Sequence, residues 1–250
     1  MSAPSKRVLI LGATSAIAQA AARRWATTGN YSFCLIARDP VKLRAVAADL
    51  QVRGAKSVVE IVCDLDDCRG HSTVLDRAVQ QLRGLDIALI AYGVLGDQLA
   101  AEKSYDAAAA VLQTNLISPI SLLTWLANYF EPRKAGTIAI ISSVAGDRGR
   151  GSNYIYGTSK AGINVMAQGI RNRLSASGVR VVTVKPGFVD TPMTAAIAKN
   201  AMFSTPEKVA KDICRSVEKG PEIVYTPWFW RWIMWIIRLI PERIFKRLNL

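Results

Sequence analysis

Short apolar runs alternate with amphipathic segments along almost the whole chain. The run RVLILG at 7–12 has the composition of a buried strand, whereas residues 16–29 place Ala18, Ala22 and Trp25 on one face of a helix. The same reading predicts strands at 7–12, 31–38, 57–64, 85–93, 136–143, 178–187 and 222–225. It predicts helices at 16–29, 40–53, 70–83, 103–131, 153–177 and 205–220.

Helix-start signals support two of these helices. Asp39 stands before Pro40, and Thr205 stands before Pro206. Aspartate and threonine are good N-caps, and proline suits the first helical position because it has no N–H to leave unpaired. We therefore expect helices to begin at both prolines.

Strands that alternate with helices predict a parallel sheet covered on both faces. The expected fold class is α/β, with a doubly wound sheet of the Rossmann type in a single domain over residues 1–226. Residues 227–250 form a hydrophobic, basic tail that we expect to be helical. Such sheets bind ligands at the carboxyl ends of their strands, so chemistry is expected there.

The composition limits the classes of binding partner that we expect. The chain of 250 residues has 32 basic and 19 acidic residues, a net charge of +13. This balance favours anionic partners, namely nucleic acid, an anionic membrane or phosphorylated ligands. No basic run with interleaved aromatic residues occurs in the body of the chain, so no nucleic acid is expected.

The cysteines and the N-terminal residues indicate in which compartment of the cell we expect the protein. The four cysteines have no metal-binding spacing, so we expect no metal and reduced thiols in a cytoplasmic protein. Residues 5–22 could be taken for a signal peptide, but they fit a strand and its phosphate loop better. The sequence contains no run of 18 or more purely apolar residues, so we predict no ordinary membrane-spanning helix.

The sequence LGATSAIA joins the first strand to the first helix. A helix N-terminus offers free N–H groups and a positive dipole end, which suit a pyrophosphate. Gly12 permits a tight turn, and Thr14 and Ser15 add hydroxyl donors. An alanine-rich turn with no ligand is the alternative interpretation.

Arg38 ends the second strand, where a dinucleotide fold meets the adenosine ribose. A guanidinium there pairs with a 2′-phosphate, which favours NADP(H), with NAD(H) possible. Asp39 is the next residue, and a carboxylate would favour NAD(H). We interpret Asp39 as the helix cap, which leaves Arg38 for the phosphate; a solvated arginine is the alternative.

Tyr156 and Lys160 are four residues apart within a predicted helix and therefore share a face. A free tyrosine has a pKa near 10, and a neighbouring cation brings that pKa toward neutrality, where the phenol can act as acid or base. Ser143, at the end of the fifth strand, is placed to hold a substrate carbonyl against the phenol.

These motifs together resemble the short-chain dehydrogenase/reductase family over residues 6–225. The resemblance rests on GATSAIA, CDLDD, AYG, TNL, SSVAG, the Tyr156–Lys160 pair and PGFVDT. It implies an NAD(P)-dependent reductase that converts a ketone into an alcohol.

The resemblance also implies residue roles. Tyr156 is the general acid, Ser143 orients the carbonyl, Lys160 tunes the tyrosine and contacts the nicotinamide ribose, and Asn115 supports a water chain to the lysine. The implied cofactor-binding residues are Gly12, Thr14, Ser15, Ala16, Ile17, Arg38, Asp64, Leu65, Gly93, Tyr156, Lys160, Pro186, Gly187, Val189 and Thr191.

The chain departs from the family pattern at two places. Ala16 and Ala18 stand where glycines are usual, and the NNAG of the fourth strand is IAYG here. The added methyl groups lie where backbone and pyrophosphate approach each other. These departures concern the affinity for the cofactor more than the catalytic chemistry. They also suggest a further alternative, a non-catalytic nucleotide-binding scaffold.

The tail is rich in tryptophan: four of the six tryptophans lie between residues 228 and 235, with Arg231 and Arg238 among them. Such a helix suits a membrane interface, and a subunit interface is the alternative. The predicted helix at 228–240 is too short to span a bilayer.

The tail and AYGVLGD at 91–97 resemble one branch of the family, the decaprenylphosphoryl-2-keto-ribose reductases. That resemblance implies a lipid-linked 2-keto sugar as substrate, a flavin oxidase partner, and a peripheral position on the inner face of the membrane. Another hydrophobic carbonyl or alcohol is the alternative substrate. Family resemblance also implies a homodimer or homotetramer built on the helices at 103–131 and 153–177.

Overall fold

The computed structural model describes residues 5–28 and 30–248. Its centre is one parallel sheet of seven strands in the order β3-β2-β1-β4-β5-β6-β7. The strands are β1 (Lys6–Leu11), β2 (Tyr31–Ala37), β3 (Ser57–Val62), β4 (Ile87–Ile90), β5 (Thr137–Ile141), β6 (Arg180–Pro186) and β7 (Ile223–Thr226). The predicted doubly wound α/β fold is confirmed, with order reversal between β1 and β4.

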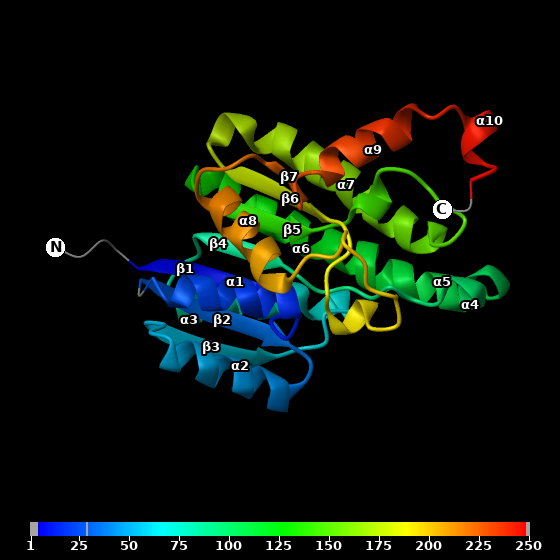
Figure 1. Cartoon of the computed structure of the whole chain (residues 1–250). Coiled ribbons are helices and arrows are strands. Elements are labelled where there is room, and N and C mark those ends of the chain that lie inside the picture. The colour runs from blue at the N-terminus through cyan, green and yellow to red at the C-terminus, as the bar shows by residue number, and fades with distance from the viewer. Residues whose placement is uncertain (1–4, 29, 249–250) are drawn as a thin grey trace.

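Helices cover both faces of the sheet, as Figure 1 shows. One face carries α1 (Ala16–Ala26), α2 (Pro40–Val52) and α8 (Pro206–Glu218). The other face carries α3 (His71–Leu82), α6 (Ser118–Phe130) and α7 (Tyr154–Leu174). Each layer therefore buries an apolar helix face against the sheet.

The alternation of side chains along the strands explains why two cores form. In β1, Val8 and Ile10 belong to one buried cluster, while Leu9 and Leu11 belong to the other. Successive strand residues point to opposite faces, so a strand buried on both faces must be apolar throughout. This is the physical reason for the uninterrupted apolar runs in the sequence.

The predicted helix starts are confirmed. The Asp39 carboxylate accepts hydrogen bonds from the backbone N–H groups of Val41 and Lys42, at 3.0 Å each. The Thr205 hydroxyl accepts one from the backbone N–H of Lys208 at 3.4 Å. Both caps satisfy N–H groups that the first helical turn leaves without a partner.

The long helical region predicted at about 103–131 is confirmed, but it is not one regular α-helix. The structure has α4 (Gln98–Lys103), α5 (Tyr105–Leu112), a π-helical turn at Gln113–Ile117, and α6. Ser104 separates α4 from α5, because it is extended and its hydroxyl accepts a hydrogen bond from the N–H of Ala107. A serine that can cap a helix competes with continuing one.

The stretch Tyr105–Arg133 is long and apolar enough to cross a membrane by length and composition, the one such helix among residues 5–28 and 30–248. The run-length criterion applied to the sequence did not find it. Within this fold, the α6 part packs Leu122, Leu126 and Phe130 into the core. The core of a folded domain is thus sufficient to explain its hydropathy.

Other boundaries differ by a few residues. The fourth strand is shorter than 85–93, and residues after Ala91 form a loop. Helix α1 ends at Ala26, and the end predicted at Gly29 lies outside the described residues. Short 3-10 turns occupy Cys68–Gly70, Glu131–Arg133, Val144–Gly146, Ser175–Ser177 and Pro192–Thr194.

The tail forms α9 (Trp230–Leu239) and α10 (Glu242–Phe245). Figure 1 shows α9 in orange-red beside β7 and α7, with α10 further out. The inner face of α9 packs Trp230 and Met234 against Val144, together with the partly buried Phe188 and Ile233. The tail is therefore helical and closely packed against the sheet domain; residues 249–250 of the predicted segment lie outside the described residues.

Candidate active site

A cavity of about 740 Å³ opens at the carboxyl ends of the central strands. It lies where the strand order reverses, the position at which doubly wound sheets bind ligands. Every cofactor-binding and catalytic residue predicted from the sequence lines it, except Asn115. The lining residues from that set are Gly12, Thr14, Ser15, Ala16, Ile17, Arg38, Asp64, Leu65, Gly93, Ser143, Tyr156, Lys160, Pro186, Gly187, Val189 and Thr191.

The phosphate loop forms one end of the cavity. Gly12 has φ of +84°, and a Cβ at this position would lie 2.5 Å from the Cβ of Tyr92. Ser15 is the N-cap of α1 but makes no side-chain capping bond, and the first turn carries no acidic residue. The N–H groups of this turn thus lack side-chain acceptors, and they can bind an anionic group.

The two alanines in place of glycines occupy different positions. Ala16 lines the cavity, whereas Ala18 is fully buried in the core beneath α1. The methyl group of Ala18 therefore packs against protein. Only the methyl of Ala16 faces the space where a pyrophosphate would lie.

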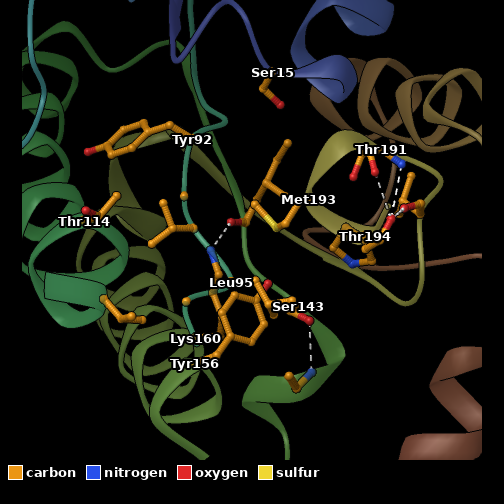
Figure 2. A pocket seen from close by; sticks show the side chains of 18 of the residues that line it. Ser15, Tyr92, Leu95, Thr114, Ser143, Tyr156, Lys160, Thr191, Met193 and Thr194 are labelled. Atoms are coloured by element: carbon orange, nitrogen blue, oxygen red, sulfur yellow. Dashed lines mark hydrogen bonds between the residues drawn. The ribbon is translucent and has the colours of Figure 1, made fainter. Parts of the chain in front are cut away.

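Tyr92, in the loop after β4, stands at the alanine position of the family's NNAG pattern, and Ile90 and Ala91 replace its two asparagines. Its hydroxyl hydrogen-bonds the Ser118 hydroxyl, which in turn donates to the carbonyl oxygen of Leu65. Figure 2 shows the Tyr92 ring turned toward the helical segment that carries Thr114. The tyrosine thus ties the strand-four loop to α6.

The predicted adenosine end is lined by Arg38, Asp64 and Leu65. Asp39 serves as the cap of α2, and hydrogen bonds from the backbone N–H groups of Lys42 and Val41, with the nearby Lys42 charge, hold its pKa below the usual value. The Arg38 side chain is exposed at the rim of the cavity. This arrangement leaves the guanidinium, not the carboxylate, available to a ligand.

The only histidine of the sequence, His71, is structural. It is buried at the start of α3, with Nε2 2.9 Å from the Leu65 carbonyl oxygen and Nδ1 3.0 Å from the Ser121 hydroxyl. Burial lowers the pKa of this imidazole. Its neutral ring bridges the Leu65 loop to α6 and does not line the cavity.

Ser143 and Tyr156 face the centre of the cavity, as Figure 2 shows. Ser143 follows β5 and accepts a hydrogen bond from the N–H of Ala145 at 3.1 Å. Burial raises the pKa of the Tyr156 phenol, and a hydrogen bond with the Ser143 side chain acts in the opposite direction. The serine and the tyrosine are therefore close enough to contact one carbonyl oxygen between them.

Lys160 is buried, and its ammonium nitrogen lies 5.6 Å from the centre of the Tyr156 ring. It donates a hydrogen bond to the carbonyl oxygen of Ile141 at 3.4 Å. Burial lowers the pKa of this ammonium to about 8. Burial is also the larger influence on Tyr156, so the lowering of the tyrosine pKa by Lys160 stays a prediction.

Asn115 lies behind the cavity wall, within the π-helical turn. Its side-chain Oδ1 accepts from the N–H of Val94 at 2.8 Å, and Nδ2 donates to the Val94 carbonyl at 2.7 Å. A Cβ on Gly93 would lie 2.8 Å from that Oδ1 and 3.4 Å from the Lys160 nitrogen. Asn115 therefore positions the loop beside Lys160; its predicted water chain is untested.

The predicted nicotinamide end is formed by the segment after β6. Gly187 packs against the tail, since a Cβ there would lie 1.9 Å from the indole nitrogen of Trp230. The Thr194 hydroxyl donates to the carbonyl oxygen of Val189 at 2.6 Å, which folds the segment over the cavity. Figure 2 shows Thr191, Thr194 and Met193 on this side.

A buried charge network beside the site escaped the sequence analysis. Lys185 and Asp147 form an ion pair at 2.6 Å, with side-chain exposures of 7% and 3%. The Tyr225 hydroxyl donates to the same carboxylate at 2.7 Å. A lysine inside the apolar run VVTVKP was the available signal, because a buried charge requires a partner.

The cavity also has lining residues that the sequence analysis did not assign, among them Arg150 and Trp230. Arg150 lies in the loop between β5 and α7, and Trp230 comes from the tail. No sequence motif marks either one, since they reach the cavity only through the packing of the loop and of α9.

Comparison with known proteins agrees with this geometry. Residues 6–201 match the short chain dehydrogenase family. The chain belongs to that family. It is 35% identical over 241 residues to an uncharacterized oxidoreductase of Mycobacterium tuberculosis H37Rv, covering 96% of each chain. It is 34% identical to an uncharacterized oxidoreductase of Streptomyces coelicolor, covering 99% of this chain and 97% of the other.

A third relative has a more specific description. A putative ketoacyl reductase of the granaticin polyketide synthase from Streptomyces violaceoruber is 32% identical over 194 residues. The match covers 77% of this chain and 71% of the relative.

Solved structures show the same fold. A short-chain dehydrogenase/reductase from Mycobacterium ulcerans superposes with a TM-score of 0.79 at 20% identity, covering 90% of this chain and 89% of the other. An NAD⁺-bound xylitol dehydrogenase gives 0.78 at 18% identity, covering 89% and 97%. At these identities the likeness concerns the fold alone.

The family implies a nicotinamide dinucleotide cofactor, and the protein is an oxidoreductase of that NAD(P)-dependent family. The residues present fit such a group: the start of α1 can receive a pyrophosphate, and Tyr156 and Lys160 lie at the opposite end of the cavity. Among residues 5–28 and 30–248, no group of three or more histidine, cysteine, aspartate or glutamate side chains could hold a metal ion.

Proposed function

We propose that the protein is an NADPH-dependent reductase of the 2-keto group of a polyprenyl-phosphate-linked sugar, acting at a membrane surface. One observation carries the proposal: helix α9 contributes to the cavity with one face and presents an aromatic stripe to solvent with the other. Trp230 lines the cavity, while Trp232 and Trp235 are 57% and 58% exposed. A lipid-linked substrate would need such a helix, with one face toward the membrane and the other toward the cavity.

The outer face of α9 has the properties of a helix that lies in a membrane interface. Its exposed stripe follows helical spacing and consists of Trp232, Trp235, Ile236 and Leu239, and Trp228, just before the helix, is also exposed. Basic residues accompany it at Arg231, Arg238, Arg243, Lys246 and Arg247. Aromatic and aliphatic side chains partition into the headgroup region, and basic residues attract anionic lipids.

The chain's own residues can perform the reduction as follows. Ser143 and Tyr156 orient the ketone oxygen; a reduced nicotinamide, when bound, would supply the hydride for the carbonyl carbon. Tyr156 then donates its phenolic proton to the developing alkoxide. Lys160 stabilises the resulting phenolate, and Asn115 holds the loop beside that lysine. The product is the secondary alcohol.

NADP(H) is the favoured cofactor, with NAD(H) as a possible substitute. The free Arg38 guanidinium at the rim supports this choice, since it can pair with a 2′-phosphate. Structural relatives with NAD⁺ and with NADP bound are both known.

The same proposal places the enzyme in the cytoplasm, peripheral on the inner face of the membrane. A flavin oxidase that makes the 2-keto sugar is the proposed partner. A homodimer or homotetramer through α5, α6 and α7 is also proposed, because Ile117, in the π-helical turn between α5 and α6, and Val165, on α7, remain exposed.

The substrate test compares three ketones at saturating NADPH: a farnesyl-phosphate-linked 2-keto pentose, the free 2-keto pentose, and a 3-ketoacyl thioester. We expect the lipid-linked sugar to have the highest kcat/KM, measured by NADPH consumption and product analysis. Preference for the thioester would instead support the second candidate, a ketoacyl reductase, which the Streptomyces violaceoruber relative favours.

The membrane test uses flotation with vesicles that contain phosphatidylglycerol. Wild-type protein should float, and Trp232→Ser combined with Trp235→Ser should weaken binding by at least roughly tenfold. Val52→Ser, at a residue 89% exposed on α2, is the matched control. If the wild type does not float and the double variant instead dissociates an oligomer, the tail is a subunit interface.

A further inference from the structure

Arg150 is a cation in the cavity with no assigned role. It lies in the loop that joins Ser143 to Tyr156, seven residues after the serine and six before the tyrosine. The residue lines the cavity together with Ser152 and Asn153 of this loop and Ile155 in the first turn of α7. Because the loop connects Ser143 to the helix that carries Tyr156, the arginine lies on the substrate side of the cavity.

The Arg150 guanidinium has no counter-ion in the part of the chain that the structure describes. No carboxylate lies within ion-pair distance, and its Nε is buried without a hydrogen-bond partner. Burial alone lowers the pKa of this side chain, with no carboxylate acting in the other direction. A half-buried cation that lacks an anion is costly, which points to a partner supplied from outside the chain.

Arg148, two residues earlier in the same loop, differs from Arg150 because its guanidinium has several partners within the protein. Its guanidinium donates to the carbonyl oxygens of Ile237 and Ile240 at 2.6 Å each and to Glu242 at 3.0 Å. It also stacks 3.7 Å from the centre of the Phe245 ring. Arg148 therefore fixes the tail to the loop, and Arg150 is left to face the cavity.

The dinucleotide has other groups for its phosphates. The start of α1 offers N–H groups for the pyrophosphate, and Arg38 lies at the rim for a 2′-phosphate. Figure 2 shows Ser15 of the phosphate loop on the opposite side of the cavity from Ser143 and Tyr156. An anion at Arg150 would consequently belong to the substrate.

Apolar residues elsewhere in the cavity wall specify the rest of that substrate. Met193, Ile197 and Trp230 line the same cavity and are apolar. A molecule that satisfies all these groups carries a ketone, an anionic group near it, and an apolar chain.

We propose that Arg150 binds a phosphate group of the substrate beside the ketone that Tyr156 protonates. The inference rests on the proposed function and specifies its substrate class. A guanidinium can donate two parallel hydrogen bonds to phosphate oxygens, so it selects phosphate by geometry as well as by charge. Arg150 is thus a specificity-determining residue.

The test measures binding without turnover. Octyl phosphate, octanoate and octanol are titrated by calorimetry into the protein saturated with NADP⁺. Octyl phosphate should bind the wild type most tightly, and Arg150→Gln should weaken it roughly tenfold to hundredfold while octanol binding stays unchanged. Arg150→Lys should recover part of the loss, since the charge returns without the paired donors.

Controls separate this inference from other effects. Arg24→Ala removes an exposed arginine on α1 that does not line the cavity, and it should leave octyl phosphate binding unchanged. Thermal unfolding should show that Arg150→Gln is folded, and its NADP⁺ affinity should be the same as that of the wild type. A fall in NADP⁺ affinity would instead assign Arg150 to the cofactor.

Several results would overturn the inference or the proposed substrate. Equal weakening of octyl phosphate and octanol in Arg150→Gln would show that the arginine acts by shape alone. Equal binding of octyl phosphate by wild type and variant would show that no phosphate is held there. If octyl phosphate binding depends on Arg150 but no lipid-linked keto sugar is reduced, the subsite stands and the proposed substrate fails. If octanoate bound more tightly than octyl phosphate, the anionic group that Arg150 binds would be a carboxylate and not a phosphate.

Discussion

The two sides of the cavity are built in different ways. The dinucleotide side consists of the loop after β1 and residues just beyond β2 and β3, and each follows its strand directly. The substrate side combines the loop before α7, the segment after β6 and the tail helix, with Arg150, Met193 and Trp230 from three distant parts of the chain. The first side is a local consequence of strand-to-helix turns, while the second depends on tertiary packing.

This difference concerns stability as well as ligands. On the dinucleotide side, glycine at position 12 and backbone N–H groups provide the binding surface. On the substrate side, buried charges hold the elements together, notably Lys185 with Asp147. Substitutions on the two sides should therefore produce different kinds of defect.

The largest effect is expected at Tyr156, where the two sides meet. Tyr156→Phe removes the proton donor but keeps the ring, so kcat should fall roughly 100-fold to 10,000-fold. NADPH affinity, measured by fluorescence titration, should change little because the binding groups of the dinucleotide side are intact. Undiminished turnover of a ketone by this variant would remove the phenol from the mechanism.

The buried ion pair gives the next effect. Lys185→Met leaves Asp147 charged and buried, which should lower the free energy of unfolding by about 3–5 kcal/mol, measured by urea denaturation. Adding Asp147→Asn should restore a large part of that loss. The matched control is Lys199→Met, whose ion pair with Asp190 is 58% and 46% exposed and should contribute at most about 1 kcal/mol.

Lys160 should produce a pH-dependent effect. Its pKa in the folded protein is about 8, below the usual 10.5, so between these values the unfolded chain binds more protons than the folded one. Stability from this group therefore rises with pH across that window. Relative to Lys160→Met, the wild type should gain about 2–3 kcal/mol between pH 7.5 and pH 10.

The Lys160 comparison is made by urea denaturation at both pH values, which needs no catalysis. The pKa of Tyr156 also affects stability at high pH, but it contributes to both proteins and largely cancels. A constant difference between wild type and Lys160→Met would show that the ammonium is not desolvated by the fold.

Arg38 should give the smallest effect, confined to the dinucleotide side. Arg38→Ala should weaken NADPH roughly tenfold and NADH hardly at all, because an exposed guanidinium–phosphate pair is screened by water. The KM for the ketone should not change. An unaltered ratio of NADPH to NADH affinity would assign the cofactor preference to another group.

Much of the dinucleotide side was predictable. Gly12, Ser15 and Arg38 were placed correctly at the cavity because each stands next to a strand end that the apolar pattern marks. Tyr156 and Lys160 were placed together because four-residue spacing on a helix fixes their relation. We predicted Asn115 as a site residue, but it lies behind the cavity wall, within the π-helical turn that precedes α6.

The sequence alone determined the α/β class, the order of most elements, the helix caps and the neighbourhood of Tyr156 and Lys160. These features depend on periodicity and on interactions within a few residues, so they can be predicted without coordinates. Tertiary structure decided which face of α9 enters the cavity, that Lys185 pairs with Asp147, and that Arg150 has no counter-ion among the residues that the structure describes. Each of these depends on contacts between residues tens of positions apart, which hydrophobic patterning does not specify.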